Sequence, residues 1–139
     1  MLLLAIATVA CAGSSTQPAS SSHDGCAPPK TVDERANGTE VRLCVGQILR
    51  VELHSSYWRD VASSQDAILL GGSTQALPPS PSACVAGAGC GTLVTTFQAV
   101  AAGTATVTAH RTTCGEALLC APNQRTFALT VTVGSRRVG

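Results

Sequence analysis

The stretch TFALTVTV, residues 126–133, carries the clearest structural signal in the chain. Threonine and alanine alternate in it with four apolar residues, Phe127, Leu129, Val131 and Val133. Successive side chains of a strand point to opposite faces, so this alternation places the apolar residues together on one face. The stretch therefore predicts a β-strand that buries one face against a core.

Six weaker runs of the same kind precede this stretch. From residue 41 onward threonine and valine dominate, and no helical stripe is sustained. Asn37-Gly38 is a turn signal, and residues 73–89, with three prolines, are predicted to form a loop. Seven short strands in about 100 residues predict an all-β fold, a seven-stranded immunoglobulin-like sandwich with disulfide-stapled loops. The predicted strands are 39–45, 49–54, a weak strand that begins at Tyr57-Trp58, 67–70, 92–99, 104–110 and 126–133.

Composition limits the number of domains and the class of partner. The chain has 139 residues, of which 12% are charged, and a formal net charge of +1. One domain is the natural count at this length. Nucleic-acid binding is not expected, because phosphate neutralisation needs a basic face. No window reaches about 18 apolar residues, so no membrane span is expected in the mature body.

The first ten residues, MLLLAIATVA, have the character of a signal-peptide core, although they are short and lack a positive start. The sequence Thr8-Val9-Ala10-Cys11 resembles the lipobox of bacterial lipoproteins, in which the cysteine is diacylated. That resemblance implies anchoring to the outer face of a bacterial cell membrane; the alternative is a secreted protein cleaved after Ala12. The expected division is signal core 1–10, lipid-anchored flexible linker 11–25, sandwich 26–133 and tail 134–139.

Seven cysteines leave one thiol unpaired unless Cys11 carries lipid. Two pairs with equal spacing favour local bridges, Cys84–Cys90 and Cys114–Cys120, each worth about 2.4 kcal/mol in the chain-entropy model. Cys26–Cys44 would add about 3.2 kcal/mol. Six cysteines still allow 15 connectivities, and a Cys90–Cys114 bridge is the main alternative. A zinc site is the other use of these thiols, but their spacing and the expected export argue against it. No metal or other cofactor is therefore expected.

The residue pattern does not indicate a catalytic site. No Gly-x-Ser-x-Gly elbow is present, His23 lies in the linker, and His54 and His110 fall on outward strand positions. The spacing of Asp60, Asp66 and Glu116 gives no reason for a carboxylate pair. We therefore expect a binding protein rather than an enzyme.

Tyr57 and Trp58 are half of the aromatic residues and are adjacent. Neighbouring residues of a strand face opposite ways, so one ring should enter the core and the other should be partly exposed. We expect Trp58 to be the core tryptophan and Tyr57 to cover a surface, where an exposed ring would suit a contact with a partner.

Several motifs follow one another along the chain: Val45-Gly46-Gln47, Tyr57-Trp58, the glycine-rich 87–92, Phe97, Gly103 and the closing Phe-x-Leu-x-Val-x-Val. Their order resembles that in chagasin-type inhibitors of cysteine proteases. The segment 89–120 is also similar to uncharacterised secreted proteins and lipoproteins of high-GC Gram-positive bacteria.

The resemblance implies that three loops at one end of the sandwich enter the cleft of papain-family proteases. Here the first loop is reduced to residues 54–56 before an aromatic, the glycine-rich loop is retained, and the third keeps only its arginine. We predict a monomeric, extracytoplasmic domain that binds a protein partner through these loops; protease inhibition is the alternative, more specific function. The predicted contact residues are Ser56, Tyr57, Gly89, Arg111 and Glu116.

Acylation of Cys11 is the first testable prediction. The intact mass of the native protein should exceed that of the polypeptide starting at Cys11 by a diacylglyceryl group, and Cys11→Ser should move the protein from the membrane fraction to the medium. An unmodified Cys11 in a membrane-free secreted protein would contradict the anchor.

Overall fold

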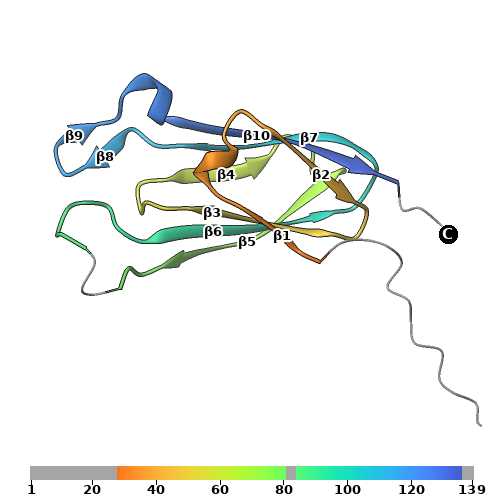
Figure 1. Cartoon of the computed structure of the whole chain (residues 1–139), viewed down its shortest axis with the longest axis horizontal. Helices are drawn as coiled ribbons and strands as arrows, with labels where there is room; N and C mark the ends of the chain where they lie inside the picture. The colour runs from red at the N-terminus through yellow and green to blue at the C-terminus, as the bar shows by residue number, and fades with distance from the viewer. Residues whose placement is uncertain (1–27, 81–83, 136–139) are drawn as a thin grey trace, which may run out of the picture.

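Two four-stranded sheets face each other in the computed structural model, which describes residues 28–80 and 84–135 (Figure 1). The first sheet has the order β1-β3-β6-β5 and the second the order β2-β10-β7-β4. The strands of the first sheet are β1 (Lys30–Val32), β3 (Ile48–Leu53), β6 (Thr92–Ala99) and β5 (Leu69–Leu77). Those of the second are β2 (Glu40–Cys44), β10 (Thr126–Gly134), β7 (Gly103–His110) and β4 (Arg59–Ser63).

Three short elements complete the fold. A small hairpin of β8 (Thr113–Gly115) and β9 (Leu118–Leu119) projects from the second sheet. Two 3-10 turns, η1 (Glu34–Ala36) and η2 (Pro122–Gln124), lie just before β2 and β10.

β10 organises the second sheet. It pairs with β7 in antiparallel and with β2 in parallel orientation. All four of its apolar residues are buried, none with more than 3% of its surface exposed. The alternation of the TFALTVTV stretch is thus the alternation between the core and the outer face of this sheet.

The core between the sheets is built mainly of small side chains. Leu49, Val51 and Leu53 of β3 have no exposed surface, and they face valine, alanine and leucine of β7 and β10. Only three aromatic rings join them: Phe97, Phe127 and Trp58. Trp58 is 5% exposed, so it is the core tryptophan that the sequence predicted.

The sandwich and the all-β class are confirmed, but the strand count is ten rather than seven. The strands β1, β8 and β9 were not predicted, because two or three residues are too few to display an alternation. Residues 73–77 belong to β5, although the segment 73–89 was predicted to be a loop. β5 is an edge strand with almost every residue exposed, so it has no period of two to read.

The strand directions bring four connections to one end of the sandwich, the loop end: residues 33–39, 54–58, the chain between β5 and β6, and 111–125. β1 starts and β10 finishes toward the other end of the molecule (Figure 1). Among the described residues, no helix is long and apolar enough to span a bilayer.

Candidate functional site

Three connections at the loop end are hydrogen-bonded to one another. Ser56, in the β3–β4 connection, donates its backbone N–H to the carbonyl oxygen of Gly89 at 2.8 Å. The next residue, Tyr57, donates its Oη–H to the carbonyl oxygen of Gly87 at 2.9 Å. The β3–β4 connection is therefore fastened to the glycine-rich loop before β6.

The same Gly87 carbonyl oxygen also accepts the backbone N–H of Glu116 at 2.6 Å. Glu116 lies at the turn of the β8–β9 hairpin, so Gly87 joins all three connections. We call this junction, formed by Ser56, Tyr57, Gly87, Gly89 and Glu116, the clasp.

Glycine is required at two positions of the clasp. Gly87 and Gly89 have φ of +79° and +67°, in the left-handed region. A Cβ on Gly89 would come within 2.1 Å of Cε2 of Tyr57, and one on Gly87 within 2.7 Å of Cβ of Glu116. The glycines thus permit both the turn and the close approach of the loops.

Two disulfides close the two loops that contribute Gly87, Gly89 and Glu116 to the clasp. Cys84 pairs with Cys90 and Cys114 pairs with Cys120, with Cα–Cα separations of 5.8 and 4.9 Å. These are the pairings that the spacing favoured, and they leave no thiols there for the zinc alternative. Within residues 28–80 and 84–135, no group of three or more His, Cys, Asp or Glu side chains is placed to hold a metal ion.

The other predicted cysteine assignments are only partly within the structure. Cys44 is a disulfide cysteine. Its predicted partner Cys26 and the predicted lipid site Cys11 lie outside the described residues.

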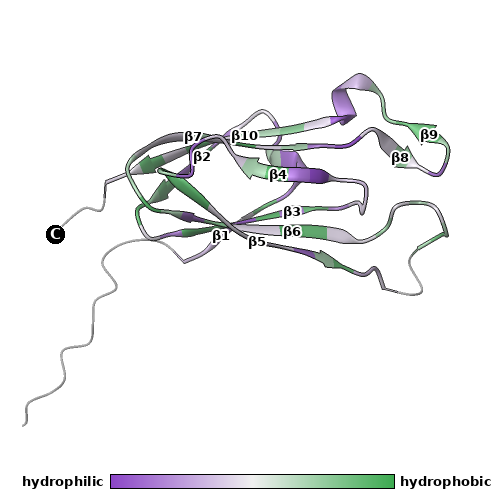
Figure 2. Ribbon diagram, turned by 180° about the vertical axis from the view of Figure 1, so that it is seen from behind, coloured by the Kyte–Doolittle hydropathy of each residue, from purple (hydrophilic) through white to green (hydrophobic). Residues whose placement is uncertain are grey.

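Both disulfide-closed loops carry exposed apolar side chains. Val85 is 77% exposed, and Leu118 and Leu119 of β9 are 59% and 72% exposed. Figure 2 shows the hydrophobic colour on β9 and on the loop before β6. We call these three side chains the apolar crest.

Sequence reasoning did not identify the apolar crest. A signal was available, because a loop closed by a short disulfide has no interior in which Leu118-Leu119 could be buried.

Arg111 is the predicted contact residue that turns inward. Its guanidinium carbon lies 4.3 Å from the centre of the Trp58 ring, and its Nε–H donates to the carbonyl oxygen of Gln124 at 2.8 Å. The indole Nε1–H of Trp58 is buried with no partner in the described part of the chain. Arg111 therefore covers the core tryptophan and holds the connection that contains η2.

The predicted contact residues thus lie at one end of the molecule. Ser56, Tyr57, Gly89 and Glu116 meet in the clasp, whereas Arg111 lies on the adjoining chain. Tyr57 is half-buried, as expected for the ring that does not enter the core. The clasp uses these groups in contacts between the connections, including the two loops that carry the apolar crest.

A second contact braces the loop end near η1. The carboxylate of Glu34 accepts the backbone N–H of His54, and its Oε2 lies 2.9 Å from Nδ1 of the same residue. The hydrogen bond to Glu34 raises the pKa of His54 above its ordinary value. Asp33 caps η1 and pairs with Arg35, which lowers the pKa of Asp33 to about 2.

Comparisons with known proteins identify the fold but not a family. No family model matches the sequence, and no curated protein matches it. The solution structure of amebosin matches with a TM-score of 0.55 and 18% identity, over 78% of this chain and all of amebosin. The crystal structure of EhICP2, a cysteine protease inhibitor from Entamoeba histolytica, matches with a TM-score of 0.55 and 7% identity, over 77% of this chain and 96% of the inhibitor. This chain therefore has a fold that a cysteine protease inhibitor also has.

Substitution of Gly89 tests the clasp, with Gly38→Ala as the matched control. Both glycines have a left-handed φ, but a Cβ on Gly38 would meet nothing within 4 Å. We expect Gly89→Ala to lower the free energy of unfolding by about 1 kcal/mol more than Gly38→Ala, the net worth of one hydrogen bond. Urea unfolding measures the difference, and the ring signals of Tyr57, the only tyrosine, should shift only in Gly89→Ala. Equal losses and unmoved ring signals would contradict the clasp.

The contact between His54 and Glu34 predicts a pH dependence of stability. Since the pKa of His54 is raised in the folded state, its contribution is complete below the unfolded pKa of about 6.5 and is lost as the pH rises through the folded pKa. The free energy of unfolding of the native chain relative to His54→Gln should therefore be larger at about pH 5.5 than at about pH 8.5. Urea unfolding at both pH values is the measurement, and a difference that does not change with pH would count against the pairing.

Proposed function

We propose that this chain inhibits papain-family cysteine proteases by inserting the loop end of its sandwich into the protease cleft. The observation that carries the proposal is the apolar crest, held on two disulfide-closed loops that the clasp joins. The fold likeness to a cysteine protease inhibitor supports the choice of partner.

Preorganised loops suit an inhibitor, because ordering side chains and loops on binding opposes affinity. Here the ordering is largely complete before binding: Gly87 O already accepts two hydrogen bonds, and each crest loop is covalently closed. Burial of Val85, Leu118 and Leu119 against a partner then contributes at roughly 25 cal/mol per Å². These three residues are the ones that we place in contact with the protease.

The contact differs from the three-loop arrangement that the sequence resemblance implies. In the β3–β4 connection, the Ser56 N–H and the Tyr57 hydroxyl already donate hydrogen bonds to the glycine-rich loop. Arg111 is likewise engaged with Trp58 and Gln124. Binding therefore depends on the two flanking loops, with the central connection as their support.

We further propose that the domain acts as a monomer held by lipid on Cys11 at the outer face of a bacterial cell membrane. Disulfides at the loop end fit an oxidising exterior. The start of β1 faces away from the loop end (Figure 1), so an anchor before it would leave the loops directed toward partners. A non-catalytic domain that binds another envelope protein through the same loops is the broader form of this proposal.

Inhibition of a papain-family protease by the native chain tests the proposal. We expect inhibition at micromolar concentration or below, and at least about tenfold weaker inhibition by Leu118→Asp/Leu119→Asp, equivalent to about 1.4 kcal/mol. Val100→Asp is the matched control, because Val100 is an exposed apolar residue in the connection between β6 and β7, away from the loop end. The enzyme is activated and then freed of reductant, since reductant would open the two bridges.

Two results would contradict the proposal. Failure of the native chain to inhibit any of several papain-family enzymes would remove the protease as partner. In that event, the chain could still be crosslinked to a protein of the envelope fraction. If this crosslinking requires Leu118 and Leu119, it would support only the broader binding function. Equal inhibition by the crest variant and the native chain would remove the apolar crest as the contact.

A further inference from the structure

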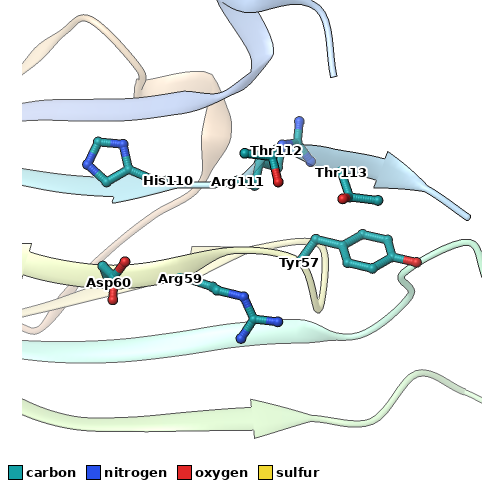
Figure 3. Close-up of a pocket in the computed structure, with 7 residues that line it drawn as sticks. All are labelled: Tyr57, Arg59, Asp60, His110, Arg111, Thr112 and Thr113. Carbon is teal, nitrogen blue, oxygen red and sulfur yellow. The ribbon is translucent and has the colours of Figure 1, made fainter. Parts of the chain in front are cut away.

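A slot opens beside the clasp, where β4 and the chain after β7 separate. Arg59 and His110 are still paired in the sheet, but the preceding and following residues diverge. The slot has a volume of about 310 Å³ and is lined by Tyr57, Arg59, Asp60, His110, Arg111, Thr112 and Thr113 (Figure 3). It lies between the β3–β4 connection and the connection of residues 111–125, which carries Leu118 and Leu119 of the apolar crest.

Arg59 is the one arginine in the described residues whose guanidinium has no hydrogen bond or ion pair. Arg35, Arg42 and Arg50 pair with carboxylates on their own segments. Arg111 and Arg125 donate to backbone carbonyl oxygens. An exposed arginine at the mouth of a slot thus keeps its donors for another molecule.

Besides the Arg59 guanidinium, the slot is lined by the hydroxyl groups of Thr112 and Thr113, which can donate hydrogen bonds. Figure 3 shows Thr112 and Thr113 across the slot from Tyr57, and Asp60 and His110 together at its other end. The Arg111 guanidinium is turned away toward Trp58, so the cation that serves the slot is Arg59. The Thr112 and Thr113 hydroxyls and the Arg59 guanidinium fit a carboxylate, because an arginine can donate two parallel N–H bonds to its oxygens. The carboxylate of Asp60, which also lines the slot, opposes this binding and favours a ligand held at the Thr112 and Thr113 end.

We propose that the slot binds an acidic side chain, aspartate or glutamate, of the protein on which the loop end docks, with Arg59 as its recognition residue. This inference rests on the proposed function, because it places a specificity contact beside the apolar crest. The crest supplies buried area, while the slot selects partners that carry a carboxylate at the matching position.

The first arm of the test measures inhibition of a papain-family protease by Arg59→Ala and Arg59→Glu. Arg42→Ala is the control, because Arg42 is an exposed arginine on β2, remote from the loop end. We expect inhibition about tenfold weaker for Arg59→Ala and weaker still for Arg59→Glu, with no change for Arg42→Ala. High salt should reduce the difference in inhibition between the native chain and the Arg59 variants, since screening weakens an exposed ion pair.

The second arm needs no protease. The full chain is titrated with the capped tripeptide Ac-Ala-Glu-Ala-amide and, in parallel, with Ac-Ala-Gln-Ala-amide, and amide NMR signals are followed. We expect saturable shifts at Tyr57, Thr112 and Thr113 with the glutamate peptide only, at concentrations on the order of millimolar, and their loss in Arg59→Ala.

The two arms separate failure of the slot from failure of the proposed function. If Arg59→Glu inhibits as well as the native chain while the crest variant does not, the slot proposal is wrong and the proposed function stands. If the native chain inhibits no protease, the peptides decide: glutamate-specific shifts that need Arg59 support the slot, and equal shifts with both peptides overturn it.

Discussion

The carbonyl oxygen of Gly87 is the point on which the loop end depends. It accepts one hydrogen bond from the Tyr57 hydroxyl and another from the Glu116 backbone N–H, at 2.9 and 2.6 Å. Each donor belongs to a different connection of the sandwich, so one atom sets the distance between three loops. Without it, the β8–β9 hairpin would lose its hydrogen bond to the glycine-rich loop, and the β3–β4 connection would keep only the hydrogen bond from the Ser56 N–H to the Gly89 carbonyl oxygen.

Covalent closure complements this junction because the loops cannot build cores of their own. The sandwich interior is composed largely of valine, leucine and alanine, and among the described residues it includes none from the two disulfide-closed loops. Bridges at Cys84–Cys90 and Cys114–Cys120 therefore supply locally what packing supplies in the sheets. The arrangement allows Val85, Leu118 and Leu119 to remain in water without collapsing onto the domain.

The sequence predicted most where a residue's environment repeats every second position. The buried face of β10 and the core position of Trp58 follow from that period, and equal cysteine spacing pointed to the two local bridges. The exposed edge strand β5 carries no such period, so its extension to Leu77 was missed. Ser56, Tyr57, Gly89 and Glu116 were chosen because they lay on predicted loops; that they meet in the clasp depends on tertiary approach, which a single sequence does not encode locally.

The cation–π contact between Arg111 and Trp58 places a charge beside the indole fluorophore at the loop end. Trp58 is the only tryptophan of the chain, and the guanidinium lies 4.3 Å from its ring centre. Indole emission is sensitive to a charge at that distance. The molecule consequently contains a single native indole fluorophore at its loop end, and the emission of unlabelled protein reports on the contact between Arg111 and Trp58.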